Sequence, residues 1–383
     1  MHMGKNQAEN RNIRHFRTAW TVPRIGVFAL RAVSVEDLKP GMVLARSLVN
    51  EDMVVMVSED TMLTKAHITR LNFLNIPVVY IKDDYELSSN YQTAAAVFNR
   101  GNAFIKEYSS VVEDAQEIFT EVGEGKPERV ENAKSVITTS LVPLSRNSGV
   151  IDHLFELNHL ASDVYQHSLR VSILAGVIAK WMHSPVSECR DIMLAGFLHD
   201  IGKTQLPQRI LDKHIDKLQG EDYETYIQHT VEGHRILSKL PGLSEGVKLA
   251  AMQHHERMDG SGFPFGSRSG DINPYASIIA IADIYDNITT EREGYVKQTP
   301  FDAISYITEH LYTSLDPIVC IPVLTHIKDA FLGSKVTLSN GLSGVIACFP
   351  NDFAARPVIS IAADELLNLN EHPDIKIIEY NPK

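Results

Sequence analysis

The feature that most constrains this chain is a set of metal-binding residue types spread over about a third of its length. The set consists of five histidines and two aspartates: His167, His199, Asp200, His229, His254, His255 and Asp283. Each piece is weak evidence alone, but together these residues offer enough ligands for two divalent transition-metal ions. Residues so far apart can share one site only if the fold brings several segments to one pocket.

Length, composition and net charge exclude some classes of protein. The chain has 383 residues, enough for two or three domains with real cores. It has no apolar run near the ~20 residues that a membrane span needs, no secretory signal, and only three widely spaced cysteines. We therefore expect a cytoplasmic protein. The net charge of −12 argues against binding to nucleic-acid polymers, although metal ions and a few basic residues would still allow a small anionic substrate.

Changes in periodicity divide the chain and predict a mainly α, multidomain fold. Residues 1–32 are expected to be disordered or tag-derived, and residues 33–88 to form a small α+β regulatory module. Residues 150–332 are expected to form an all-helical core. Residues 333–383 are expected to form a small β element with a hairpin at an Asn-Gly turn.

Residues 89–149 have apolar side chains at three- and four-residue spacing, which predicts a helical linker or hairpin. A glycine-rich break at 123–127 separates two helical runs. The pattern fits a homodimer formed through residues 90–148, and it fits equally well a helical pair that packs on the chain's own neighbouring domain.

The pair His199-Asp200 closes an apolar stretch and is followed by Gly202 and Lys203. Adjacent side chains on a helix point about 100° apart, so the pair can meet one metal cluster only if the helix ends there, as Gly202 indicates. An aspartate can bridge two cations with its two oxygens, whereas a histidine binds one. In isolation, the same residues would more often form an ordinary helix end, with Lys203 near the negative end of the helix dipole.

The remaining members are each ambiguous alone. His254 and His255 end an apolar run and precede a loop, Asp-Gly-Ser-Gly-Phe-Pro, whose glycines permit close backbone approach to a ligand. Asp163 and His167 are four residues apart and would share a helical face. Asp283 lies in an apolar run, where a carboxylate is costly unless it is paired or binds a metal.

Over roughly residues 150–330, the sequence resembles the HD-GYP family of HD-domain metal phosphohydrolases. The resemblance lies in the order of its motifs, H…HDIGK…H…HHE-x-x-DGSG-(aromatic)-P…D. The resemblance implies a helical core with two or three metal ions, often iron or manganese, and hydrolysis of cyclic di-GMP to linear pGpG and on to GMP. It implies that the seven residues above are metal ligands, with His229 chosen over nearby His234, and that Asp163 stands at the position of a third-metal ligand. The substrate contacts that it implies are Lys203, Asp259, Gly260, Gly262, Phe263, Pro264, Arg292 and Lys297.

Three positions depart from the family pattern. Phe263 replaces the signature tyrosine, which keeps the aromatic plane but removes a hydroxyl group. Asp163 stands where members with three metals have glutamate, so a third ion would depend on a shorter side chain. The stretch 289–297 is one residue longer than usual, so Arg292 aligns but Lys297 is displaced from the second basic position.

The resulting hypothesis is a metal-dependent phosphodiesterase for cyclic di-GMP. Asp200 and a hydroxide would bridge two metals, the hydroxide would attack phosphorus, and Lys203 with Arg292 would stabilise charge on the phosphoryl oxygens. Three alternatives stay open: a nucleotide phosphohydrolase with a generic HD core, a phosphodiesterase for hybrid cyclic GMP-AMP, and a non-catalytic receptor for a cyclic dinucleotide.

Overall fold

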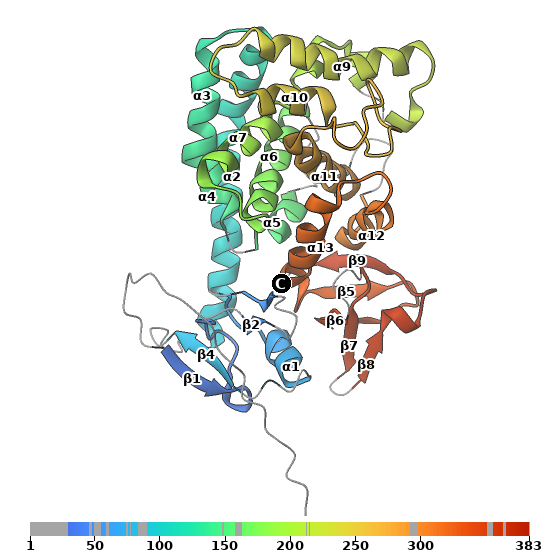
Figure 1. Ribbon diagram of the computed structural model, residues 1–383. Coiled ribbons are helices and arrows are strands. Elements are labelled where there is room, and N and C mark those ends of the chain that lie inside the picture. Colours follow the sequence, from blue (N-terminus) through green and yellow to red (C-terminus); the bar gives the residue numbers. More distant parts are fainter. Residues whose placement is uncertain are drawn as a thin grey trace, which may run out of the picture.

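The computed structural model describes residues 30–45, 48–49, 55–58, 61–73, 76, 78–82, 90–147, 149–157, 163–211, 213, 215–291, 297–350, 355–362 and 365–382. Helices form the bulk of this part of the chain, and β-strands lie at both of its ends (Figure 1). The predicted mainly α fold with two flanking modules is therefore confirmed. The segment 1–32 lies outside the described residues except at its end, where strand β1 (Leu30–Ser34) begins three residues before the expected start of the module.

The helical part runs from residue 90 to residue 331. Its elements are α2 (Asn90–Gly123), α3 (Glu128–Val136), η2 (Ile137–Leu141), α4 (Val142–Ser145), α5 (Val150–Leu157), α6 (Val164–Trp181), α7 (Val186–Leu198), η3 (Ile201–Gln205), α8 (Gln208–Leu211), η4 (Ile215–Lys217), α9 (Glu221–Ser238), α10 (Glu245–Gln253), α11 (Pro274–Thr289), α12 (Pro300–His310) and α13 (Pro317–Phe331).

Helix α6 is the central helix of this core. Every residue from His167 to Ala179 is buried, as expected for a helix that is apolar on all sides and surrounded by others. Helices α2, α4, α7, α11 and α13 pack against it. A polar group on α6 therefore faces the protein interior and needs a partner there.

Helix α11 also runs through the interior. The side chain of Asn273 caps it by accepting a hydrogen bond of 2.9 Å from the backbone N–H of Tyr275, and Pro274 occupies the first turn. The cap fixes where the helix begins. Asp283 and Asp286 are both buried on this helix, so it brings two carboxylates into the core.

Helix α2 is long and joins the N-terminal module to the helical core (Figure 1). From Phe104 onward, one face of the helix is buried, with Tyr108, Ala115 and Val122 in the same apolar core as α6 and α7. The structure thus shows the second of the two arrangements weighed for this region, packing on the chain's own domain. A homodimer through residues 90–148 stays a prediction.

The N-terminal module has a small core of its own. Strand β1 pairs antiparallel with β4 (Val78–Lys82), and β2 (Leu48–Val49) pairs with β3 (Val55–Val57). Helix α1 (Lys65–Phe73) packs beside them and contacts the rest of the protein. Arg70 Nη1 on α1 lies 3.3 Å from Asp329 Oδ1 on α13.

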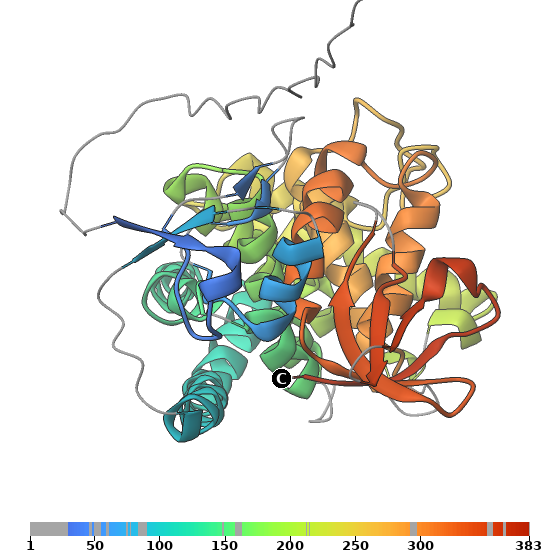
Figure 2. The same cartoon turned by 90° about the horizontal axis from the view of Figure 1, so that it is seen from below.

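The C-terminal region is a five-stranded antiparallel sheet in the order β8-β7-β6-β5-β9. Its strands are β5 (Lys335–Leu338), β6 (Ser343–Cys348), β7 (Val358–Ala362), β8 (Glu365–Asn368) and β9 (Ile377–Asn381), with the short helix η5 (Leu369–Glu371) after β8. Seen from below, the sheet lies beside the N-terminal module (Figure 2). Unlike that module, it shares the main core, to which Val336, Ile346, Ile359 and Tyr380 belong.

Among the described residues, no helix combines the length and the apolar character required to cross a membrane.

Candidate metal centre

The structure brings all seven predicted metal ligands together in two neighbouring clusters, each of whose donor atoms lie within 4.8 Å of one another. The first cluster, which we call the α6/α11 cluster, contains His167, His199 and Asp283. The second, which we call the α9/α10 cluster, contains Asp200, His229, His254 and His255. Five segments of chain converge on this point: α6, the turns after α7 and α10, α9, and α11.

The local fold at His199 and Asp200 explains how adjacent residues reach both clusters. Helix α7 ends at Leu198, and Asp200 precedes the short helix η3. Gly202 on η3 lies so close to α9 that a Cβ atom there would be 1.9 Å from the carbonyl oxygen of His229. Only glycine permits this approach, and it places Asp200 beside the histidine of α9.

Asp200 lies between the two clusters and presents one carboxylate oxygen to each. Its Oδ2 atom is 3.6 Å from His167 Nε2 and 3.4 Å from His199 Nε2. Its Oδ1 atom is 3.4 Å from His229 Nε2 and 3.6 Å from His254 Nε2. Two ligands of one ion with bonds of ~2.0–2.2 Å lie about 3.0–3.4 Å apart, so the spacing is close to that of a bridged metal pair.

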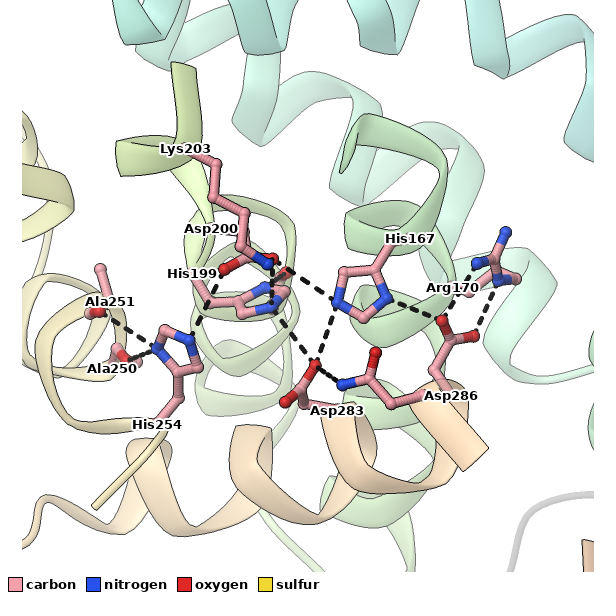
Figure 3. A network of polar contacts seen from close by, with 12 residues as sticks. His167, Arg170, His199, Asp200, Lys203, Ala250, Ala251, His254, Asp283 and Asp286 are labelled. Carbon is pink, nitrogen blue, oxygen red and sulfur yellow. Dashed lines mark hydrogen bonds and ion pairs between the residues drawn. The ribbon is translucent and has the colours of Figure 1, made fainter. Parts of the chain in front are cut away.

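A buried network of side chains orients His167 (Figure 3). Its Nε2 atom is 3.0 Å from Asp283 Oδ1, and its Nδ1 atom is 2.7 Å from Asp286 Oδ2. Arg170 holds Asp286 with two hydrogen bonds, of 2.7 Å from Nε and 3.0 Å from Nη2. Asn287 donates a hydrogen bond of 2.7 Å to Asp283 Oδ1. Such outer partners fix the ring and the tautomer of a metal-binding histidine.

Backbone carbonyl groups orient three other histidines. His199 Nδ1 is 2.8 Å from the carbonyl oxygen of Gly196, and His229 Nδ1 is 2.6 Å from that of Tyr226. His254 Nδ1 is 3.1 Å from the carbonyl oxygen of Ala250 and also from that of Ala251. When Nδ1 donates to a carbonyl group, Nε2 keeps its lone pair for a metal.

The electrostatics of the site fit metal ligation. Burial lowers the pKa of His199 to about 4 and that of His229 to about 3, and it holds the pKa of His255 well below its usual range. These rings are therefore neutral at pH 7, which is the form that binds a metal. Burial opposes ionisation of Asp200, yet the charge of Lys203 holds the pKa of that carboxyl group well below its usual range.

Three buried polar atoms at this point have no hydrogen-bond partner among the described residues: His199 Nε2, Asp200 Oδ1 and His255 Nε2. Leaving such atoms unpaired costs about 1–3 kcal/mol each. All three belong to the two clusters and are of the types that bind transition metals. The donor set therefore fits a pair of divalent ions.

The metal centre opens into a cavity of about 1240 Å³. Of the predicted site residues, those that line it are Asp163, His167, Asp200, Lys203, His255, Phe263 and Asp283. Lys203 lies at the base of the cavity, with Nζ 2.5 Å from Asp200 Oδ2 and 5.4 Å from the centre of the Tyr226 ring. Asp200 raises the pKa of Lys203 against the opposing effect of burial, so the ammonium stays charged.

The glycine-rich loop presents one side chain to the cavity. The ring of Phe263 stacks on His255, with ring centres 4.4 Å apart. Gly262 allows this because a Cβ atom there would lie 2.3 Å from the carbonyl oxygen of His255. Asp259 is exposed and accepts hydrogen bonds from the backbone and hydroxyl groups of Ser261. Asp259, Gly260, Gly262 and Pro264 are not among the described residues that line the cavity.

Two further predicted residues, Asp163 and Lys297, do not belong to the metal clusters. Asp163 precedes α6, is exposed, and accepts a hydrogen bond of 3.1 Å from the hydroxyl group of Tyr165. It lies on the cavity wall outside both clusters, so its role as a third-metal ligand stays a prediction. Lys297 Nζ lies 4.0 Å from the centre of the Phe155 ring, away from the described cavity lining. Arg292 lies outside the described residues.

Some residues that shape the site were missed by the sequence analysis. Arg170 is 1% exposed. It could have been found as a charged residue within the apolar run of α6. Glu256 is 3% exposed and accepts hydrogen bonds of 2.9 Å from the backbone N–H groups of Phe265 and Ser267, which fixes the glycine-rich loop. Its position directly after the histidine pair could have indicated a role at the site.

Comparison with known proteins bears on the same segment. Residues 154–319 match the family described as an HD domain. A cyclic di-GMP phosphodiesterase of Pseudomonas aeruginosa is 29% identical over 229 residues, which cover 60% of this chain and 55% of the relative. A cyclic di-GMP phosphodiesterase of Thermotoga maritima is 40% identical over 151 residues, or 37% of this chain and 40% of the relative. The 3′3′-cGAMP-specific phosphodiesterase 3 of Vibrio cholerae is 35% identical over 154 residues, which cover 39% of this chain and 32% of the relative.

The chain spans about half or less of the length of these curated relatives. The matched segment includes all seven residues of the two clusters and the glycine-rich loop. The chain therefore contains an HD domain at residues 154–319, and its relatives support an HD-GYP-type family for this segment.

Proposed function

We propose that this protein is a metal-dependent phosphodiesterase that hydrolyses cyclic di-GMP to linear pGpG and on to GMP. The observation that carries the proposal is the position of Asp200, whose two oxygens face two separate clusters of histidine and aspartate at the base of a large cavity. The names of the relatives supply the substrate class, since two act on cyclic di-GMP and one on 3′3′-cGAMP.

The two clusters would each hold one divalent ion, with iron or manganese favoured and Asp200 shared between them. Bound there, the ions would supply an activated water molecule and neutralise charge on the phosphate oxygens. The chain's own residues then position the reactants. Asp286 and Arg170 keep the ring of His167 fixed, and the backbone carbonyls do the same for His199, His229 and His254.

Two cations near the metal centre would bind the reacting phosphodiester. Lys203 is held at the cavity base by Asp200. Arg257 lines the cavity, and its Nη1 atom donates to the carbonyl oxygens of His254 at 3.2 Å and Glu256 at 2.8 Å. Within the described chain, no carboxylate forms an ion pair with Arg257, so its charge is available to an anionic ligand.

The aromatic pair Phe263–His255 would form one wall of the substrate site. The exposed part of the Phe263 ring offers a flat apolar surface, on which a purine base stacks at ~1–3 kcal/mol. The cavity exceeds the roughly 300–1,000 Å³ of ordinary small-molecule sites, so its size suits a ligand as large as a dinucleotide.

A second candidate is hydrolysis of 3′3′-cGAMP. The observation that favours it is Phe263, which lacks the hydroxyl group of the signature tyrosine and so changes the polarity of the base-contacting wall. The third candidate, a receptor that binds without cleavage, is less well supported because all seven ligand-type residues meet in two clusters that could each hold an ion.

The test is a side-by-side assay of the full chain, purified without oxygen and loaded with iron or with manganese. Elemental analysis gives the number of ions per chain, and chromatography follows cyclic di-GMP, 3′3′-cGAMP and an ordinary nucleoside triphosphate. We expect two ions per chain, fastest turnover of cyclic di-GMP, and pGpG appearing before GMP. Protein that holds two ions and binds cyclic di-GMP without forming product would instead be a receptor.

A further inference from the structure

The C-terminal sheet contributes a wall of the cavity that opens from the metal centre. The residues that do so are Ala355, Arg356, Leu369, Ile375, Lys376 and Ile377. They lie beyond residue 319, where the match to the HD domain ends. The cavity is therefore built by the HD domain together with a region that the family model does not include.

Side-chain hydrogen bonds hold this wall in one shape. The guanidinium group of Arg356 donates to the backbone carbonyl oxygens of Leu369 at 2.9 Å, His372 at 2.8 Å and Ile375 at 2.5 Å. Asn370 Nδ2 donates in return to the carbonyl oxygen of Arg356 at 2.9 Å. The segment that leads into β9 is thus tied at several points, although it has little regular structure.

The wall is also fixed relative to the metal centre. Tyr380 on β9 donates a hydrogen bond to buried Asp152 on α5. Its ring packs edge-on against Phe155, Phe301 and Phe331, with ring centres 5.2, 5.8 and 5.4 Å apart. The sheet belongs to the same apolar core as α6 and α11, so the wall and the clusters form one body.

Lys376 is the cation of this wall that is available to a ligand. Its backbone N–H donates to Ser339 Oγ at 3.0 Å, and its carbonyl oxygen accepts from the backbone N–H of Ser339 at 2.8 Å, so its main chain is fixed. Its side chain is exposed, and no described carboxylate forms an ion pair with it. By contrast, Arg356 is engaged by carbonyl groups, and Lys213 on the cavity lining lies 3.0 Å from Asp222 Oδ2.

We propose that this wall binds the half of the cyclic dinucleotide that is not cleaved, with Lys376 contacting its second phosphodiester. The inference rests on the proposed function. A cyclic dinucleotide carries two phosphodiesters, and the metal centre can engage only one of them at a time. The other keeps a full negative charge that must lose water on binding, so it needs a cation away from the metals. Ile375 and Ile377 line the cavity on either side of Lys376 in the chain.

The test compares Lys376→Glu with Lys335→Glu. Lys335 is an exposed lysine on β5 of the same sheet and lies outside the described cavity lining, so it is a matched control. Each variant is assayed with cyclic di-GMP and with bis(p-nitrophenyl) phosphate, a small diester that has no second phosphate. Melting temperature and metal content confirm that the variants are folded and loaded.

We expect Lys376→Glu to raise KM for cyclic di-GMP by about 10-fold or more, because a carboxylate would then face the second phosphate. Its KM and kcat for the small diester should stay within about twofold of wild type, as should all values for Lys335→Glu. An unchanged KM for cyclic di-GMP in Lys376→Glu would overturn the inference. So would an equal loss with both substrates, which would place the effect at the metal centre.

A separate outcome identifies failure of the proposed function itself. If the wild-type protein cleaves the small diester but no cyclic dinucleotide, the proposed substrate is wrong. The role proposed for Lys376 is then wrong as well. The wild-type measurement decides this before any variant is compared.

Discussion

The two metal clusters are supported in different ways. In the α6/α11 cluster, His167 and Asp283 depend on side-chain partners, namely Asp286 for the histidine and Asn287 for the carboxylate, while His199 depends on a backbone carbonyl group. In the α9/α10 cluster, His229 and His254 depend on backbone carbonyl groups of their own helices. Asp200 is common to both.

This difference indicates where a substitution can alter the site. A backbone carbonyl moves only if its helix moves, so the orientation of His229 and His254 follows from the fold itself. A side-chain partner, by contrast, can be removed by one substitution. We therefore expect that ion binding by the α6/α11 cluster is weakened by changing Asp286 or Asn287, whereas backbone carbonyl groups orient His229 and His254.

The largest effect should come from the shared residue. Asp200→Asn keeps the size of the side chain but removes the charge that both ions need. We expect fewer than two ions per chain and a loss of hydrolysis of at least ~1,000-fold, because several kcal/mol of transition-state stabilisation depend on the metal pair. Elemental analysis and turnover of cyclic di-GMP measure this.

The matched control for that change is Asp114→Asn, on an exposed position of α2. It should leave metal content and turnover unchanged. Wild-type metal loading and activity in folded Asp200→Asn, with the fold verified by circular dichroism, would contradict the shared position of this carboxylate.

An intermediate effect should come from Asp286→Asn, which tests the comparison directly. The change removes the charge that orients His167 and leaves buried Arg170 without its carboxylate partner. We expect the affinity for one of the two ions to fall about 10–100-fold while the other is retained. Titration with a chelator, followed by metal analysis, should resolve two release steps that are further apart than in wild type.

The ion in the α9/α10 cluster serves as the internal control in the same sample. Equal weakening of both ions would show that the two clusters are not independently supported. Because an unpaired buried charge costs about 3–5 kcal/mol, melting temperature should also fall, and it should be measured alongside.

The smallest effect should come from Phe263→Tyr. The ring stays on His255 and gains only a hydroxyl group, so kcat/KM for cyclic di-GMP should stay within about threefold of wild type. Phe263→Ala, which loses the stacked pair, should raise KM by ~3–10-fold with metal content unchanged. A change in metal stoichiometry in the tyrosine variant would show that the loop supports the α9/α10 cluster as well as the substrate.

The resemblance in order and spacing predicted that the seven residues share one site, and the structure does bring them together, while their role as metal ligands stays a prediction. Gly202 indicated that α7 ends near His199, and the helix does end at Leu198. The sequence could not predict the ion pair of Arg170 with Asp286, because the two residues are 116 positions apart and neither belongs to a recognisable motif. Which distant charges pair depends on how α6 packs on α11.

The surroundings of two predicted residues near element ends also depend on the fold and could not be predicted from spacing. The spacing of Asp163 and His167 implies a shared helical face, but α6 begins only at Val164, so Asp163 precedes the helix and lies on the cavity wall. Lys297 precedes α12, and its side chain lies over Phe155 on α5. The cavity wall from the C-terminal sheet depends on tertiary packing, so the spacing of residues in the sequence could not predict it.

The main apolar core runs from Phe104 to Tyr380. The segment that matches the HD-domain family, residues 154–319, is shorter than the stretch that builds this core. A fragment cut at those limits would expose the buried faces of α2 and of the terminal strands to water, and it would be prone to aggregate. The segment that the family match covers and the stretch that builds the main core are therefore different parts of the same polypeptide.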